Sequence, residues 1–160
     1  MNVLKSKYDL LKKLEDKTAV AGKAMEQLKE SKNIAEQYKK HLKSNKEESY
    51  KNAFKATDSI ITSINSLMDD MLGKEDKRQG ITRNPDPSTI SYLFNARRYI
   101  GSLLQEPGNT EKQLIKNAYE KITPVIDKID AFFKNDWANY RKEIEALNLS
   151  LFKEVEALKE

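Results

Sequence analysis

The chain has 160 residues and a formal net charge of +4; 38% of its residues are hydrophobic, 34% are charged, and only five are glycine and four proline. This composition favours long, solvated helices over a β-rich or compact α/β domain, and no apolar run is long enough to span a bilayer. With no cysteine and one histidine, His41, the sequence excludes disulfides, zinc fingers, iron–sulfur clusters and thiol catalysis.

The first 45 residues predict one long amphipathic helix from residue 2 to about residue 45. Apolar or small side chains recur there in steps of three and four, at Leu4, Leu11, Leu14, Thr18, Ala21, Met25, Leu28, Ala35 and Leu42. No proline interrupts the run, which would measure about 60 Å at 1.5 Å per residue. A helix of this length needs a partner surface to be stable.

A second helix is predicted after a reversal at residues 44–46. Its apolar stripe contains Tyr50, Phe54, Thr57, Ile61, Ile64, Met68 and Met71. Gly73 stands where a C-terminal capping glycine is expected. Because the connection is so short, residues 2–73 should form an antiparallel helical hairpin.

Residues 74–86 predict the one substantial loop. Asp86 is then the expected N-cap of a third helix, with Pro87 at its first helical position. The apolar side of that helix is predicted to contain Ile90, Leu93, Phe94, Tyr99 or Ala96, Ile100, Leu103 and Leu104.

A fourth helix is predicted to begin at a capping box formed by Thr110 and Gln113. Pro124 lies inside it and predicts a kink rather than an end. Its stripe runs through Leu114, Ala118, Ile122, Val125, Ile126, Ile129, Phe133, Trp137, Tyr140, Ile144 and Leu147. Residues 87–147 should therefore form a second hairpin.

Residues 148–150 are expected to close the fourth helix, and residues 148–160 form a C-terminal tail. In that tail, Leu151, Phe152, Val155 and Leu158 predict either a short terminal helix or a segment that folds back onto the bundle. The sequence as a whole predicts a single all-α domain over residues 1–160, an elongated four-helix bundle made of two antiparallel hairpins.

No catalytic, cofactor-binding or metal-binding residues are predicted. The closest acidic pairs, Asp69 with Asp70, Asp127 with Asp130 and Glu143 with Glu145, are expected on exposed helix faces, whereas acid–base catalysis needs a carboxyl group in an apolar pocket. Arg97 and Arg98 could bind a carboxylate or phosphate, but adjacent residues on a helix point in different directions. His41 is expected to be a solvated helix residue. The sequence therefore predicts a protein that is not an enzyme.

The aromatic residues Phe132, Phe133, Trp137 and Tyr140 allow two interpretations. Residues 133, 137 and 140 share one helix face, and such a stripe is more often part of a core than of a binding site. The alternative is an exposed aromatic shelf on which a sugar or peptide could stack.

Positive charge is concentrated near the N-terminus. Residues 1–46 contain twelve lysines and six acidic residues, a net charge of +6, whereas residues 47–160 have a net charge of −2. The lysines alternate with acids and no arginine is among them, which favours a solvated face with i,i+4 ion pairs over a nucleic-acid site. No nucleic-acid partner is expected.

Two stretches of the second half resemble a known family. They are NPDPSTISYLFNARRYIGSLLQ at residues 84–105 and FFKNDWANYRKEIEALNLSLF at residues 132–152. They are similar to the C-terminal helical region of large bacterial exported proteins that carry a sortilin-type β-propeller and are described as glycosyl-hydrolase-like. The resemblance implies location in the periplasm or at the cell surface through the parent protein, although the first residues here lack the pattern of a secretory signal. No functional residue carries over, because the propeller would hold any active site.

Two hypotheses follow. In the first, the chain is a non-catalytic accessory or interaction domain of a larger exported protein, and its partner is the rest of that polypeptide or another protein. In the second, it is a free-standing helical adaptor or scaffold, with a homodimer as its simplest form, that self-associates through an apolar seam at residues 4–42 longer than its neighbours can cover.

Overall fold

The computed structural model describes residues 3–43, 48–74 and 87–149, and this part of the chain is all-α. The helices are α1 (Val3–Lys43), α2 (Glu48–Leu72), α3 (Thr89–Gly101), α4 (Asn109–Phe132) and α5 (Ala138–Ala146), with a π-helical turn, η1 (Phe133–Trp137), between the last two. The predicted all-α bundle of two antiparallel hairpins is confirmed. The predicted fourth helix corresponds to α4, η1 and α5 together.

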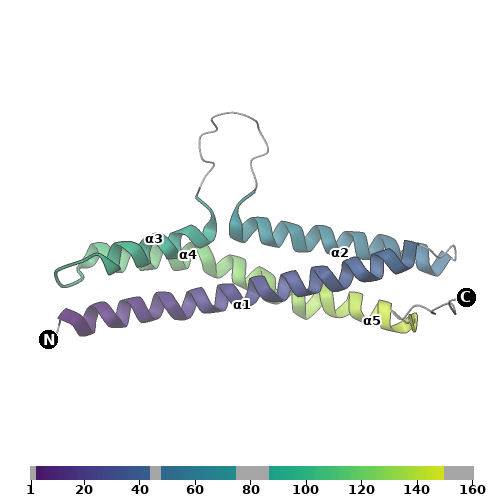
Figure 1. Ribbon diagram of the computed structural model, residues 1–160, viewed down its shortest axis with the longest axis horizontal. Coiled ribbons are helices and arrows are strands. Elements are labelled where there is room, and N and C mark those ends of the chain that lie inside the picture. The colour runs from purple at the N-terminus through teal and green to yellow at the C-terminus, as the bar shows by residue number, and fades with distance from the viewer. Residues whose placement is uncertain (1–2, 44–47, 75–86, 150–160) are drawn as a thin grey trace, which may run out of the picture.

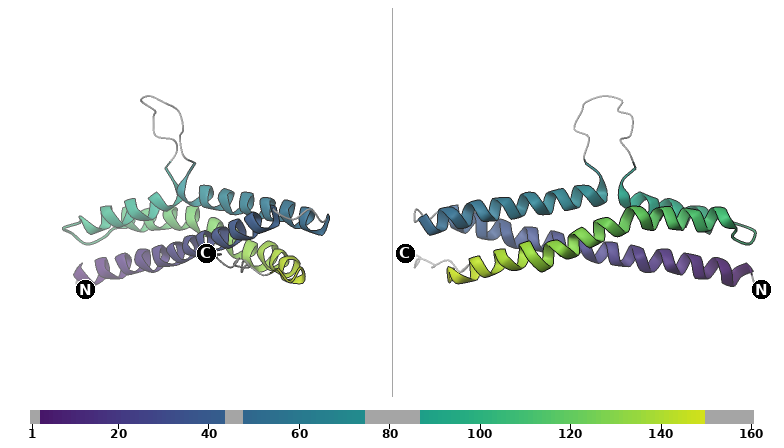
Figure 2. Two further views of the ribbon diagram at one scale, coloured as in Figure 1. Left: turned by 45° about the vertical axis from the view of Figure 1, so that its right-hand side comes forward. Right: turned by 180° about the vertical axis from the view of Figure 1, so that it is seen from behind.

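The helices are arranged in three columns (Figure 1). One column is α1, which extends along the whole bundle. The second contains α2 and then α3, placed end to end and running opposite to α1, and the third contains α4, η1 and α5 (Figure 2). Accordingly α1 packs against α2 in one half of the bundle and against α3 and α4 in the other, while α5 packs against α2.

The end of α2 and the start of α3 meet in space. The Gly73 amide donates to the Asp69 carbonyl (2.8 Å), and Gly73 has a φ of +82°, so it is the predicted capping glycine. Across the junction, the Thr89 hydroxyl donates to the Asp70 carbonyl at 2.7 Å. A Cβ atom on Gly73 would lie 3.4 Å from the Cβ atom of Ser88. The end of α2 and the start of α3 are therefore in direct contact.

Both predicted helix starts in the second hairpin need correction. The first helical residue of α3 is Thr89 and its N-cap is Ser88, so Pro87 precedes the helix instead of opening it; Asp86 lies outside the described residues. Helix α4 begins at Asn109, because the Glu111 carboxylate accepts a hydrogen bond from the Gly108 amide at 2.6 Å and caps the helix two residues earlier than the predicted Thr110–Gln113 box.

Two other predictions for the second hairpin agree with the structure. Helix α4 continues through Pro124 as predicted, and its ribbon bends partway along its length (Figure 2). Asn148, with a φ of +49°, closes α5 in the left-handed conformation that asparagine tolerates. The predicted reversal at residues 44–46 and the fate of residues 151–158 lie outside the described residues.

The core runs along the axis between the three columns. Its fully buried large apolar side chains are Leu14, Leu28, Leu42, Ile64, Met71, Leu93, Ile100, Ile122 and Ile129. Each helix contacts only the two neighbouring columns, so the rest of its surface faces solvent. Some predicted stripe residues lie on that exposed surface, namely Leu4, Phe94, Tyr99 and Leu104. Ala96, rather than Tyr99, is the buried residue on α3.

Candidate interaction surface

The π-helical turn η1 changes which face of the third column is apolar. Before it, buried residues follow steps of three and four up to Phe132, and the same steps would continue to residues 136, 139 and 143. Those positions hold three exposed polar residues, Asp136, Asn139 and Glu143. The apolar residues come one position later, at Trp137, Tyr140 and Ile144. A π turn contains one residue more than an α turn, so η1 absorbs the extra residue and keeps both apolar stretches facing the bundle.

As a result, the four aromatic residues divide between core and surface. Phe132 and Tyr140 are buried, each with 4% of its surface exposed, while Phe133 and Trp137 are half-buried. The predicted core stripe is thus partly confirmed at Phe133 and Trp137, which pack against the core while half-buried, and it omits Phe132, which the helix frame places inward. The Trp137 ring lies 6.4 Å from the Phe133 ring and 5.4 Å from the Tyr140 ring, measured between centroids. The aromatic shelf is therefore partly core and partly exposed.

Phe133 and Trp137 line a groove between α1 and the third column, which we call the aromatic groove. Its volume is about 450 Å³, and its residues are Val20, Lys23, Ala24, Gln27, Ile126, Ile129, Asp130, Phe133 and Trp137. Val20, with 49% of its surface exposed, is the most accessible aliphatic side chain in it. At the rim, the Asp130 carboxylate accepts a hydrogen bond from the Lys134 ammonium at 2.5 Å. The groove combines an apolar floor with a charged edge.

Behind the groove, a buried polar contact fixes the aromatic wall. The hydroxyl groups of Tyr140 and Thr57 lie 3.1 Å apart and join α5 to α2. Burial raises the pKa of the Tyr140 hydroxyl above its ordinary value, so the side chain stays neutral. Tyr140 in turn packs against the Trp137 ring.

A pattern in the sequence indicates the aromatic groove, although it lies beside the one apolar stripe predicted for each helix. Val20 stands beside the buried Ala21, Ile126 beside the buried Val125, and Phe133 beside the buried Phe132. Adjacent residues on a helix are about 100° apart, so the less buried residue of each pair lies toward the edge of the helix face that the core covers. Which of these less buried side chains meet across α1 and α4 depends on how the columns pack.

The acidic pairs considered from the sequence lie on exposed helix faces. The Lys128 ammonium donates to the Asp70 carboxylate at 3.0 Å, and Arg141 donates to Glu145 at 2.6 Å. Arg97 and Arg98 are exposed, and His41 is half-buried rather than fully solvated. In residues 3–43, 48–74 and 87–149, no cluster of three or more histidine, aspartate or glutamate side chains could hold a metal ion.

Two lysines of α1 form the predicted kind of pair with an acid four residues later. The Lys12 ammonium lies 3.1 Å from the Asp16 carboxylate, and the Lys32 ammonium 3.9 Å from that of Glu36. Each pair is largely solvated, and such pairs contribute little to stability. Charge on this helix is thus partly neutralised along its length.

Comparison with protein-family models, curated proteins and solved structures gives no match to this chain. The resemblance to the helical region of sortilin-type propeller proteins accordingly stays a prediction. None of the described helices has a stretch long and apolar enough to cross a membrane.

Proposed function

We propose that this chain is a non-catalytic helical interaction domain that binds a protein partner through the aromatic groove. The observation that supports the proposal is the half-exposed pair of Phe133 and Trp137, held with Val20 between two long helices. Trp137 is the only tryptophan in the chain. Tryptophan is among the residues that contribute most when an interface buries them.

The shape and chemistry of the groove favour a helical or extended protein segment as the partner. A groove between parallel ridges of side chains accepts an amphipathic segment that inserts apolar residues. The charged rim, with Lys23 and Asp130, would then pair with polar residues at the edge of the interface. The half-buried aromatic rings gain most from such a partner, because their exposed area is removed from water.

In line with the resemblance, we propose that the domain belongs to a larger exported protein and packs against the rest of that polypeptide or another protein. An immunoblot of the source cells, with an antibody against this segment, tests this context. A band far larger than the 18.5 kDa of this chain would support it. A band at about that size would support the free-standing scaffold.

The scaffold hypothesis requires free apolar surface on α1. Between Leu14 and Leu42, however, most of the predicted seam is buried against the other helices of the same chain. Leu4 and Tyr8, with 73% and 64% of their surfaces exposed, remain accessible at the N-terminal end. Light scattering over a concentration series would detect self-association through that end, and Tyr8→Glu should abolish it.

The groove is tested with two substitutions on the same turn of α1. Val20 lines the groove, whereas Ala19 is exposed outside it. Tagged wild-type protein, Val20→Glu and Ala19→Glu are each cross-linked in the source cells and recovered. We expect Val20→Glu to reduce recovery of a specific partner at least about tenfold, the effect of roughly 1.4 kcal/mol, and Ala19→Glu to leave it unchanged. Equal recovery with both variants, or no specific partner with any, would refute the proposal, provided that thermal melts show all three folded.

A further inference from the structure

Helix α3 carries two arginines and two aromatic rings on the side that faces away from the bundle. Its opposite side packs against α1 and α4 and contains the buried residues Leu93, Ala96 and Ile100. On the outer side, Phe94 and Tyr99 have 50% and 47% of their surfaces exposed. Arg97 and Arg98 are exposed beside them. Arginine and tyrosine are enriched at the centres of protein interfaces, so this side of α3 has the composition of a binding surface.

Three of these residues, Phe94, Arg97 and Arg98, form one continuous surface, which we call the arginine–aromatic strip. Adjacent residues on a helix diverge by about 100°. Phe94, however, precedes the two arginines by three and four positions, so it lies between them, about 60° from Arg97 and about 40° from Arg98. A partner that contacts the Phe94 ring is therefore within reach of both guanidinium groups.

The positive charge of the strip has no acidic partner among the described residues. Helix α3 contains two arginines and no acid, a net charge of +2. Within residues 3–43, 48–74 and 87–149, no hydrogen bond or ion pair joins either guanidinium group to another residue. By contrast, Arg141 on α5 donates to Glu145 at 2.6 Å. The next acid along the chain after the strip, Glu106, accepts a hydrogen bond from Ser6 of α1. Only solvent balances the charge of the two arginines on this surface.

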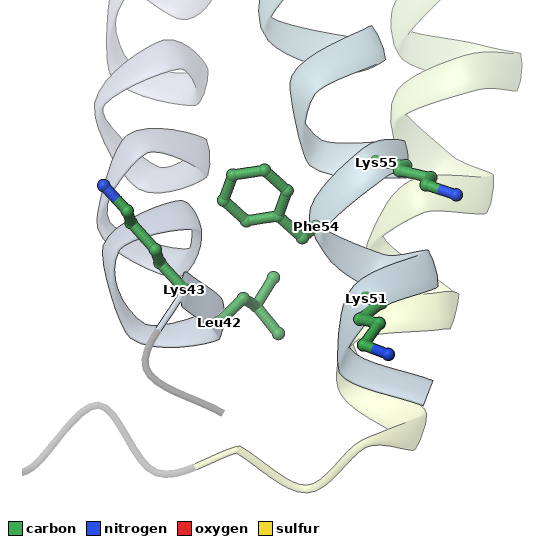
Figure 3. Close-up of a pocket in the computed structure, with 5 residues that line it drawn as sticks. All are labelled: Leu42, Lys43, Lys51, Phe54 and Lys55. Atoms are coloured by element: carbon green, nitrogen blue, oxygen red, sulfur yellow. The ribbon is translucent and has the colours of Figure 1, made fainter. Parts of the chain in front are cut away.

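The lysines at the C-terminal end of α1 differ in this respect. They surround a hollow of about 370 Å³ that is lined by Leu42, Lys43, Lys51, Phe54 and Lys55 (Figure 3). The Lys51 ammonium pairs with the Glu48 carboxylate at 3.0 Å. Lys39, whose ammonium lies 5.4 Å from the centre of the Phe54 ring, pairs with Asp58. Lysine also lacks the planar fork with which arginine binds a carboxylate. The strip on α3 is therefore the better match for an anionic partner.

We propose that the arginine–aromatic strip is a docking surface for an acidic protein segment in which an apolar residue stands between two carboxylates. The carboxylates accept paired hydrogen bonds from Arg97 and Arg98, and the apolar residue covers the Phe94 ring and removes it from water. A nucleic acid fits less well, because a helix of 13 residues is only about 20 Å long and presents two cations here, too few to follow a phosphate backbone. The strip is separate from the aromatic groove, so each can be tested alone.

Synthetic peptides and the 160-residue chain test the proposal. The probe is a helical peptide of about 20 residues made of leucine, alanine and glutamate, with a glutamate one turn before and one turn after each leucine. A matched peptide has glutamine in place of every glutamate. Isothermal titration calorimetry at low salt measures both affinities. We expect the glutamate peptide to bind at least about tenfold more tightly, because only carboxylates form charge-assisted pairs with arginine.

Substitutions in the protein then locate the binding surface. Arg97→Gln/Arg98→Gln should weaken binding of the glutamate peptide at least about tenfold, and Phe94→Ala should weaken it several-fold. The control, Arg141→Gln/Lys142→Gln, removes the same charge from an adjacent exposed pair on α5 and should leave the affinity unchanged. Circular dichroism of each variant establishes that the helices are retained.

Three results would overturn the proposal. One is an equal loss of affinity in the two double variants, because binding would then follow net charge alone. Another is the absence of detectable binding of the glutamate peptide at about 1 mM. The third is tighter binding of a single-stranded DNA of about 16 nucleotides that depends on Arg97 and Arg98, which would make the strip a nucleic-acid site.

Discussion

At the scale of single residues, the buried hydroxyl pair between α2 and α5 has a defined direction. The Thr57 hydroxyl donates its only proton to the Ala53 carbonyl at 2.7 Å. Tyr140 must therefore donate to the Thr57 oxygen, 3.1 Å away. Both side chains are buried, so the Tyr140 hydroxyl depends on Thr57, and not on water, for its hydrogen-bond acceptor.

This direction predicts an asymmetric effect of mutation. Thr57→Val keeps the shape of the side chain but leaves the buried Tyr140 hydroxyl without an acceptor, so we expect a loss of about 1–3 kcal/mol in the free energy of unfolding. Tyr140→Phe removes the donor, leaves the Thr57–Ala53 bond in place and should cost about 1 kcal/mol. Urea unfolding of both variants and of the double variant gives the three values.

In that series the double variant should be more stable than Thr57→Val alone, because it no longer buries an unpaired hydroxyl. Strictly additive losses would mean that the two hydroxyl groups do not interact in solution.

At the scale of helices, the π turn is explained by the sequence around it. Residues 133–137 contain one residue more than a continuous α-helical stripe can accommodate. Without that turn, either Phe132 or Tyr140 would rotate away from the core. The turn also places Trp137 at the edge of the aromatic groove, so a packing requirement and the candidate interaction surface have the same origin.

Removing the extra residue provides a direct test. Deletion of the exposed Asn135 should convert η1 into α-helix, keep both apolar stretches in phase and change the free energy of unfolding by no more than about 1 kcal/mol. Deletion of the exposed Glu120, in the regular part of α4, rotates Ile115 and Ala118 by about 100° relative to Ile122. That control should cost more than about 3 kcal/mol, because buried side chains leave the core.

Thermal and urea unfolding, followed by circular dichroism, measure both deletions. If losing Asn135 destabilises the protein as much as losing Glu120, the frame shift is not the reason for the π turn.

At the scale of the whole molecule, the second column consists of two helices that meet. Gly73 and Ser88 are adjacent, and the Thr89 hydroxyl bonds to the Asp70 carbonyl. The two ends of the connecting segment are therefore already held together by described contacts. Closing a connection whose ends are adjacent costs little, whatever its length.

We therefore expect that replacing residues 75–86 with a Gly-Ser dipeptide leaves the bundle intact. Helical content should be unchanged and the free energy of unfolding should change by less than about 1 kcal/mol, because loop closure depends only weakly on length. Circular dichroism and urea unfolding test this expectation. A large loss of stability would show that residues 75–86 contribute contacts of their own to the fold.

The extent of α1 and α2, and the ends of α2 and α5, were predictable because they depend on local signals. The three- and four-residue periodicity predicts α1 and α2 to within a few residues, and Gly73 and Asn148 mark helix ends through their backbone conformation. The helix starts were less predictable, because Ser88 and Glu111 compete with neighbouring residues that could serve as caps equally well. Competition of this kind is resolved by the surroundings of the helix.

For the candidate surface, the sequence indicated a dense aromatic group but not which rings face outward. That division depends on the frame shift at residues 133–137 and on the position of Val20 across the groove. The shift is visible in the sequence as polar residues at 136, 139 and 143. The contact between α1 and α4 is not visible, because it joins residues about a hundred positions apart.

The sequence by itself determined that this protein is helical, where its helices lie to within a few residues and most of the apolar side of each, because these properties follow from spacing within a few turns. Only the tertiary structure decided that α2 and α3 share one column, that Phe132 enters the core and that Phe133 and Trp137 line a groove. The physical reason is that periodicity specifies a face but not its partner. The partner is selected by packing between distant segments, where burial of one side chain excludes another.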